Sequence, residues 1–252
     1  MRTPEYFTTP QGRRLAYHFT QGRGPSIVFL GGLKSDMEGT KALYLEEWAI
    51  ASGRSFLRFD YSGHGQSSGT FEEGAIGDWA QDAEAIIKAV THGPIVAVGS
   101  SMGGWQALLL GKRMPEQIAG MVLIAAAPDF TEDGYWANFT DAQKQQLEKN
   151  GQVELPSDYM EPYIVTARMI ENGRAHLVLR EALDLPFAVR ALQGTADTAV
   201  STATAIALLD HAASPDMELV LVKDADHRFS DARCLELIKQ AVLEVSAPPA
   251  QQ

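Results

Sequence analysis

The sequence predicts one α/β domain built on an eight-stranded, mostly parallel sheet with helices on both faces. Short β-branched and apolar runs alternate along the chain with helical patterns, which is typical of a doubly wound sheet. The runs are nearly continuous in apolar residues, as expected of strands that helices cover on both sides. With 252 residues, 45% of them hydrophobic, the chain can bury one large core.

The predicted elements follow one another in a regular order. Core strands are expected at 26–30, 55–59, 94–98, 121–125, 188–192 and 217–222, after an N-terminal hairpin formed by 5–9 and 14–19. Helices are expected at 41–51, 77–90, 105–114, 199–212 and 231–245. Residues 1–128 and 186–245 therefore form the predicted core.

Residues 129–185 interrupt this alternation and predict a helical lid inserted between two core strands. The segment has no strong buried strand pattern but holds many aromatic residues among its charges. Helices are expected at 143–150 and 158–172. The last residues, 246–252, are rich in Pro, Ala and Gln, and we expect them to be disordered.

Charge and composition limit the binding partners and the cellular compartment that we expect for this protein. The formal net charge of −11 argues against nucleic acid and anionic lipid surfaces as partners. The chain contains no run of about 18 apolar residues, so we expect no membrane span. Its first residues also lack the apolar run of a signal peptide. A single cysteine, Cys234, suits a reducing compartment. We expect a bacterial cytoplasmic protein or, for a processed form, one of the mitochondrial matrix.

A nucleophile motif directly follows one predicted strand. Gly99-Ser100-Ser101-Met102-Gly103 matches G-x-S-x-G and lies between strand 94–98 and a helical pattern, the context that a nucleophile elbow requires. Small flanking residues permit the sharp turn. Ser101 is the predicted nucleophile and Ser100 occupies the variable position. The alternative is a glycine-rich turn in which the serine only caps a helix.

Two backbone N–H groups are candidates for an oxyanion hole. Met102 follows the serine and supplies the first. Gly31-Gly32-Leu33 ends strand 26–30, the loop that carries the second donor in such enzymes, with Leu33 preferred over Gly32. The alternative for this loop is an ordinary turn at the end of a strand.

The order serine, acid, histidine selects the other two residues. His227 follows the last core strand, whereas His211 lies within a helical pattern and His176 near the end of the insertion. Asp197 follows strand 188–192 and is the predicted acid, with Asp226 as the fallback. Asp197 could otherwise be a helix cap.

The segment Asp60-Tyr61-Ser62-Gly63-His64-Gly65-Gln66-Ser67 resembles a D-x-x-G-x-G-x-S loop, which we interpret as a structural turn. His64 precedes the serine, so it does not fit the catalytic order. No spacing of His and Cys residues indicates a metal site, and we expect no cofactor.

Together, these motifs resemble the α/β-hydrolase superfamily over nearly the whole chain. Segments 33–42, 58–63, 98–105 and 226–228 are similar to the mitochondrial acyl-protein thioesterases also described as mycophenolic acid acyl-glucuronide esterases. The resemblance implies hydrolysis of acyl-thioesters and acyl glucuronides, with Ser101, Asp197 and His227 as catalytic residues. The implied partners are a small ester or thioester, or an acylated protein cysteine.

Two other functions fit the same sequence. One is a general carboxylesterase, lipase or perhydrolase that acts on small esters. The other is a binding protein that has kept the fold and the three residues but does not turn over. Halide-displacing and epoxide-opening relatives use an aspartate nucleophile, so Ser101 argues against both.

Overall fold

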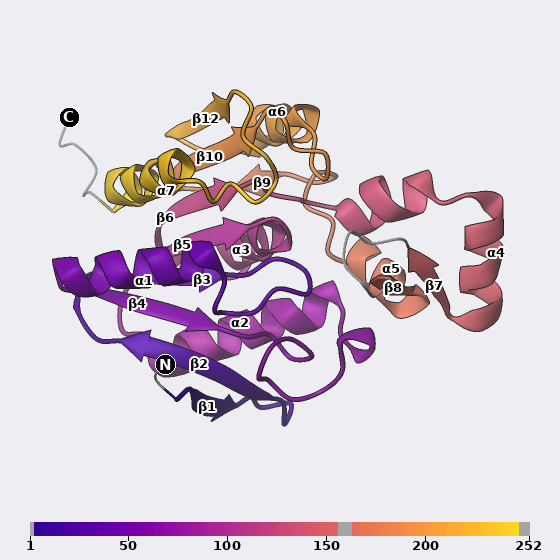
Figure 1. Ribbon diagram of the computed structural model, residues 1–252, viewed down its shortest axis with the longest axis horizontal. Helices are drawn as coiled ribbons and strands as arrows, with labels where there is room; N and C mark the ends of the chain where they lie inside the picture. Colours follow the sequence, from indigo (N-terminus) through magenta and orange to yellow (C-terminus); the bar gives the residue numbers. More distant parts are fainter. Residues whose placement is uncertain (1–2, 156–162, 247–252) are drawn as a thin grey trace.

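The computed structural model describes residues 3–155 and 163–246, and Figure 1 shows its arrangement. Eight strands form one sheet in the order β1-β2-β4-β3-β5-β6-β10-β12. They are β1 (Glu5–Thr8), β2 (Arg14–Thr20), β3 (Arg23–Leu30), β4 (Arg54–Phe59), β5 (Ile95–Ser100), β6 (Ile118–Ile124), β10 (Ala188–Gly194) and β12 (Met217–Val222). Within this sheet, only β1 with β2 and β2 with β4 pair antiparallel, so the predicted mostly parallel sheet is confirmed.

Helices cover both faces of this sheet, as the apolar strands predict (Figure 1). The five core helices are α1 (Thr40–Ser52), α2 (Ile76–Val90), α3 (Met102–Arg113), α6 (Thr202–His211) and α7 (Ala232–Val245). Strand β3 shows how the two layers form. Ile27 and Phe29 pack in one apolar cluster with α1 and α7, while Val28 and Leu30 pack in the other with α2 and α3. Alternate side chains of one strand therefore belong to separate cores.

Residues 129–185, the insertion, contain more strand than the sequence predicts. After a π-helical segment (Phe130–Trp136) come α4 (Asp141–Asn150), β7 (Gln152–Leu155), β8 (Tyr163–Thr166), α5 (Ala167–Arg174) and β9 (Leu183–Asp184). Strand β9 pairs with β11 (Ala212–Ala213) in a short two-stranded sheet. The elements from α4 to α5 project to one side of the sheet in Figure 1.

The predicted helix 158–172 is wrong at its N-terminal end. Residues 163–166 form β8, which pairs antiparallel with β7. Their sequence, Tyr-Ile-Val-Thr, is aromatic and β-branched and favours a strand. The helix begins only after Thr166, whose hydroxyl accepts a hydrogen bond from the Met169 N–H at 3.1 Å. Residues 158–162 lie outside the described residues, as does the predicted tail apart from Ser246.

Asp129 fastens the insertion at its base. Its side chain is fully buried and accepts hydrogen bonds from the N–H groups of Val178 at 2.8 Å and Leu179 at 3.0 Å. These two residues follow α5, so one carboxylate joins the beginning of the insertion to its return. Asp129 itself has a φ of 55°, a conformation that Asp tolerates better than most residues.

None of the helices in the described ranges combines the length and the apolar character that crossing a bilayer requires.

We predict that Asp129→Ala lowers the free energy of unfolding by about 2–4 kcal/mol, because two buried N–H groups lose their acceptor. Urea titration of wild type and variant measures the loss. Asp133→Ala is the control, since Asp133 pairs with Arg180 but is half exposed, and its loss is expected to stay below about 1 kcal/mol. Equal losses in the two variants would contradict the anchoring role of Asp129.

Candidate active site

Ser101 lies in a strained turn between β5 and α3. Its backbone has a φ of 55° and a ψ of −119°, values that few non-glycine residues adopt. Hydrogen bonds on both sides hold the turn: the Ser101 N–H donates to the Ile124 carbonyl at 2.9 Å, and the Ala127 N–H donates to the Ser101 carbonyl at 3.1 Å. The hydroxyl is thereby presented at the carboxyl end of the sheet, beside the first turn of α3.

Glycines make this turn possible because the backbone is crowded on every side. A Cβ at Gly103 would collide with the carbonyl oxygens of Leu30 and Gly31, and one at Gly99 would collide with Gly103 itself. The predicted need for small residues around Ser101 therefore has a physical cause. The absence of side chains at these glycines brings the turn at Ser101 into direct contact with the loop that follows β3.

The structure brings the three predicted polar residues together. His227 Nε2 lies 3.1 Å from Ser101 Oγ, and His227 Nδ1 lies 2.8 Å from Asp197 Oδ2. Each residue comes from the loop after a parallel strand: β5 for Ser101, β10 for Asp197 and β12 for His227. Because parallel strands end at one edge of a sheet, residues far apart in the sequence meet there.

The fallback acid and the other histidines lie elsewhere. Asp226 is exposed, and its carboxylate accepts from the Phe229 N–H at 3.1 Å. His211 Nε2 contacts the Glu181 carbonyl at 2.8 Å, and His176 Nδ1 contacts the Asn172 carbonyl at 2.7 Å. Neither of these histidines is hydrogen-bonded to Ser101.

Hydrogen bonds from several donors keep the side chain of Asp197 in its charged carboxylate form. Its side chain is fully buried, and Oδ1 accepts from the N–H groups of Ala199 and Val200, both at 2.8 Å. Burial raises the pKa of Asp197, but hydrogen bonds from His227, Val200 and Gln193 outweigh it and leave the pKa below its ordinary value. The N-cap of α6 is Ser201 rather than Asp197, so the helix-cap alternative does not hold.

Gln193 is a positioning residue that the sequence does not reveal. Its Nε2 donates to Asp197 Oδ2 at 2.9 Å, the same oxygen that faces His227, and to the Val200 carbonyl at 3.0 Å. It lies on β10, one residue before Gly194, and is 1% exposed. A glutamine at the buried carboxyl end of β10 is the one signal that marks it, because a buried amide needs a hydrogen-bond partner.

The two predicted oxyanion donors face the same cleft as Ser101. Leu33 and Met102 both line it, and within the described ranges neither N–H donates a hydrogen bond to another residue of the chain. Gly32 is also close, since a Cβ built on it would lie 3.5 Å from the Ser101 Cβ. Two unengaged N–H groups beside the hydroxyl suit a developing negative charge.

Asp60 fastens the loop that carries Leu33. Its buried carboxylate accepts from the Met37 N–H at 2.6 Å and from the Gln66 N–H at 2.8 Å. Burial raises the pKa of Asp60 to about 6, although both N–H groups oppose this rise. The predicted structural turn at 60–67 therefore supports the segment next to the cleft.

His64, in the same turn, is buried between aromatic rings. Its ring meets those of Tyr61 and Trp79 edge to face, with centroids 5.7 and 5.1 Å apart. Burial lowers the pKa of His64 to about 4, so the ring is neutral at pH 7. This environment suits a packing role.

The cleft above Ser101 has a volume of about 690 Å³ and two contrasting walls. The insertion supplies one wall with Phe130, Tyr135 and Tyr163, and Met102 adds to it. Burial raises the pKa of Tyr135 to about 12, so its hydroxyl stays protonated. The loop after β3, the start of α1 and the loop after His227 supply the other, polar wall.

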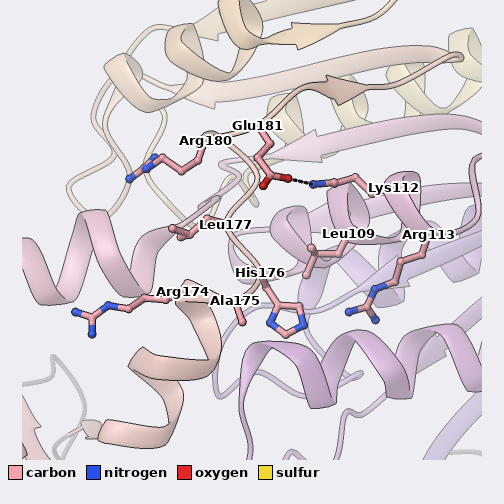
Figure 2. A pocket seen from close by; sticks show the side chains of 9 residues that line it. All are labelled: Leu109, Lys112, Arg113, Arg174, Ala175, His176, Leu177, Arg180 and Glu181. Carbon is pink, nitrogen blue, oxygen red and sulfur yellow. Dashed lines mark ion pairs between the residues drawn. The ribbon is translucent and has the colours of Figure 1, made fainter.

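A second hollow, of about 510 Å³, lies away from Ser101 between α3 and the segment after α5 (Figure 2). Four cations line it: Lys112, Arg113, Arg174 and Arg180. Each lies near a carboxylate; Arg174, for example, pairs with Glu132 at 2.6 Å, and Lys112 lies 3.9 Å from Glu181. The Lys112–Glu181 pair joins the core to the insertion, whereas Arg174 and Glu132 both belong to the insertion. In the described ranges, no three His, Cys, Asp or Glu side chains gather in a way that could hold a metal ion.

Fold and site together define an α/β hydrolase with a nucleophile elbow. Comparison with known proteins agrees. Residues 26–159 match the family model described as serine aminopeptidase, S33. The rat palmitoyl-protein thioesterase ABHD10, mitochondrial, is 32% identical over 94% of this chain and 80% of its own length, and the mouse protein is 35% identical over 89% and 76%.

Solved structures give the same result. A putative hydrolase from Agrobacterium vitis superposes with a TM-score of 0.93 at 37% identity, over 97% of this chain and 98% of that one. Mouse ABHD10 superposes with a TM-score of 0.89 at 30% identity, with the same coverage. The chain belongs to the α/β-hydrolase superfamily, in the group that contains the ABHD10 thioesterases, and it is an enzyme of the esterase and thioesterase class.

We predict that Gln193→Leu lowers kcat about tenfold or more and leaves KM nearly unchanged, because Asp197 loses one charge-assisted hydrogen bond. Steady-state kinetics on a short acyl ester measures both constants. Gln106→Leu is the matched control, since Gln106 is also buried but bonds to the Ile76 carbonyl. Retention of wild-type kcat in Gln193→Leu would contradict the positioning role.

Proposed function

We propose that this protein hydrolyses carboxylic esters and thioesters through an acyl-enzyme on Ser101. The observation that carries the proposal is the continuous set of hydrogen bonds from Ser101 through His227 to Asp197 at the floor of an open cleft. A weak nucleophile beside a base, with the base oriented by a buried acid, is the arrangement that covalent acyl transfer requires.

In the first half of the proposed reaction, Ser101 Oγ attacks the acyl carbon while His227 Nε2 takes the hydroxyl proton. Asp197 holds the imidazole by Nδ1 and stabilises its charged form, for which its lowered pKa suits it. His227 then gives the proton to the leaving group as the bond to the acyl carbon breaks. Water then attacks the acyl carbon and loses a proton to His227, and His227 returns this proton to Ser101 Oγ as the bond to the acyl carbon breaks and the acid leaves.

The N–H groups of Met102 and Leu33 are the proposed oxyanion donors. Both line the cleft beside Ser101. In hydrolases of this kind the loss of one such donor typically costs about 2.7–4 kcal/mol of transition-state stabilisation.

Leaving-group chemistry favours thioesters and esters over amides. A thiol has a pKa near 8.5, so a thiolate departs with little help, whereas an alcohol needs the proton from His227 and an amine needs it more. The aromatic side chains that line the cleft favour substrates with an apolar acyl group. The names of the relatives support the acyl-protein cysteine as one substrate, and acyl glucuronides remain a predicted second class.

A cytoplasmic or mitochondrial matrix location remains our prediction, and the mitochondrial relatives support the latter. A general esterase, lipase or perhydrolase of small esters is the alternative activity, and a non-catalytic binding role is the alternative function. The family model is named for an aminopeptidase, an enzyme that cleaves amide bonds, so amides also need to be tested as substrates.

We predict that wild-type protein cleaves both acyl esters and acyl-thioesters from two to sixteen carbons, and that amides of the same acids react far more slowly. Ser101→Ala is expected to lower kcat/KM on the order of 10⁵-fold, because it removes the attacking oxygen. Steady-state kcat/KM values across the three series are the measurement.

The outcomes separate the alternatives. Cleavage of small esters without thioesters would favour the general esterase. Thermal stabilisation by these compounds without turnover would favour the binding protein, and activity retained in Ser101→Ala would remove Ser101 as the nucleophile.

A further inference from the structure

Charge is distributed unevenly around the cleft. The whole chain carries a net charge of −11, yet the polar wall of the cleft holds two cations, Lys41 and Arg228, against one carboxylate, Asp36. The lining residues from the insertion are uncharged and include three aromatic rings, those of Phe130, Tyr135 and Tyr163. A substrate that lays its apolar acyl group on the aromatic wall therefore turns its other end toward the cations.

Lys41 lines the same cleft as Ser101 and His227. Its ammonium donates a hydrogen bond to the carbonyl of Arg228, the residue directly after His227. His227 Nε2 is the atom that passes the proton to the leaving group in the proposed mechanism. A leaving group that takes this proton therefore departs beside the loop to which the ammonium is bonded.

The position of Lys41 is costly for the fold. It is the second residue of α1, where a cation opposes the helix dipole, and the first turn contains no acidic side chain. Burial lowers the pKa of Lys41 to about 8, with partial compensation from the Asp226 carboxylate. A pKa above 7 keeps the ammonium charged at neutral pH. One hydrogen bond to a carbonyl uses only one of its three N–H donors.

We propose that Lys41 is a specificity-determining residue that binds a carboxylate on the leaving group of the substrate. This inference rests on the proposed function and names the substrate class of the same cleft: acyl esters or thioesters whose alcohol or thiol carries a carboxylate a few bonds from the cleaved bond. The remaining N–H donors of the ammonium meet the carboxylate as the acyl group is transferred to Ser101.

The test compares two thioesters with one acyl group, S-octanoyl-3-mercaptopropionate and S-octanoyl-3-mercaptopropionamide. The leaving thiols are matched in size and differ by a carboxylate or a neutral amide. For wild type we expect kcat/KM to favour the carboxylate about tenfold or more. Lys41→Met is expected to abolish this preference while it retains activity on the amide, and Lys41→Arg to keep part of it. Lys88→Met, an exposed lysine on α2, is the control and keeps the wild-type ratio.

Two other outcomes overturn the proposal. A wild-type ratio near one removes the carboxylate site, and this result needs no folded variant. Equal loss on both thioesters in Lys41→Met, with no change in their ratio, would mean that Lys41 only supports the loop of His227. Failure of wild type on both thioesters would instead count against the proposed function itself.

Discussion

The close approach of two backbone segments determines how this site is built. The turn at Ser101 packs directly on the carbonyl oxygens at the end of β3, and only a glycine at position 103 leaves room for that contact. The contact places the loop of Leu33 beside Ser101, whose backbone has a strained φ of 55°. Strain of this kind persists only where the surrounding structure holds it, and here hydrogen bonds to β6 and to Ala127 do so.

The rest of the site follows from the parallel sheet. Loops after β5, β10 and β12 carry Ser101, Asp197 and His227, and their common edge turns three distant segments into one set of hydrogen bonds. Two further side chains support these loops. Asp60 accepts a hydrogen bond from the loop that carries Leu33, and Gln193 donates one to Asp197. The insertion adds aromatic residues to the lining of the cleft.

Most of the core could be predicted because its signals are local. Apolar strands and the glycines around Ser101 report their structure within a few residues, and the order of Ser101, Asp197 and His227 follows from the fold. β8 was missed because the residues that make it a strand sit in a segment with a helical pattern, and pairing with β7 decides the outcome. Gln193 and Lys41 were missed for a different reason. Their roles depend on side-chain contacts that a sequence pattern does not report: Gln193 bonds to Asp197 nearby in the chain, and Lys41 bonds to the distant Arg228.

The central claim is that acyl transfer passes through Ser101, and trapping the intermediate tests it most directly. Wild-type protein quenched in acid during turnover of an octanoyl thioester, digested and examined by mass spectrometry, should carry one octanoyl group on the peptide that contains Ser101. The same peptide from Ser101→Ala should carry none. An octanoyl group on another residue, such as Cys234, or turnover in Ser101→Ala without any adduct, would contradict the account.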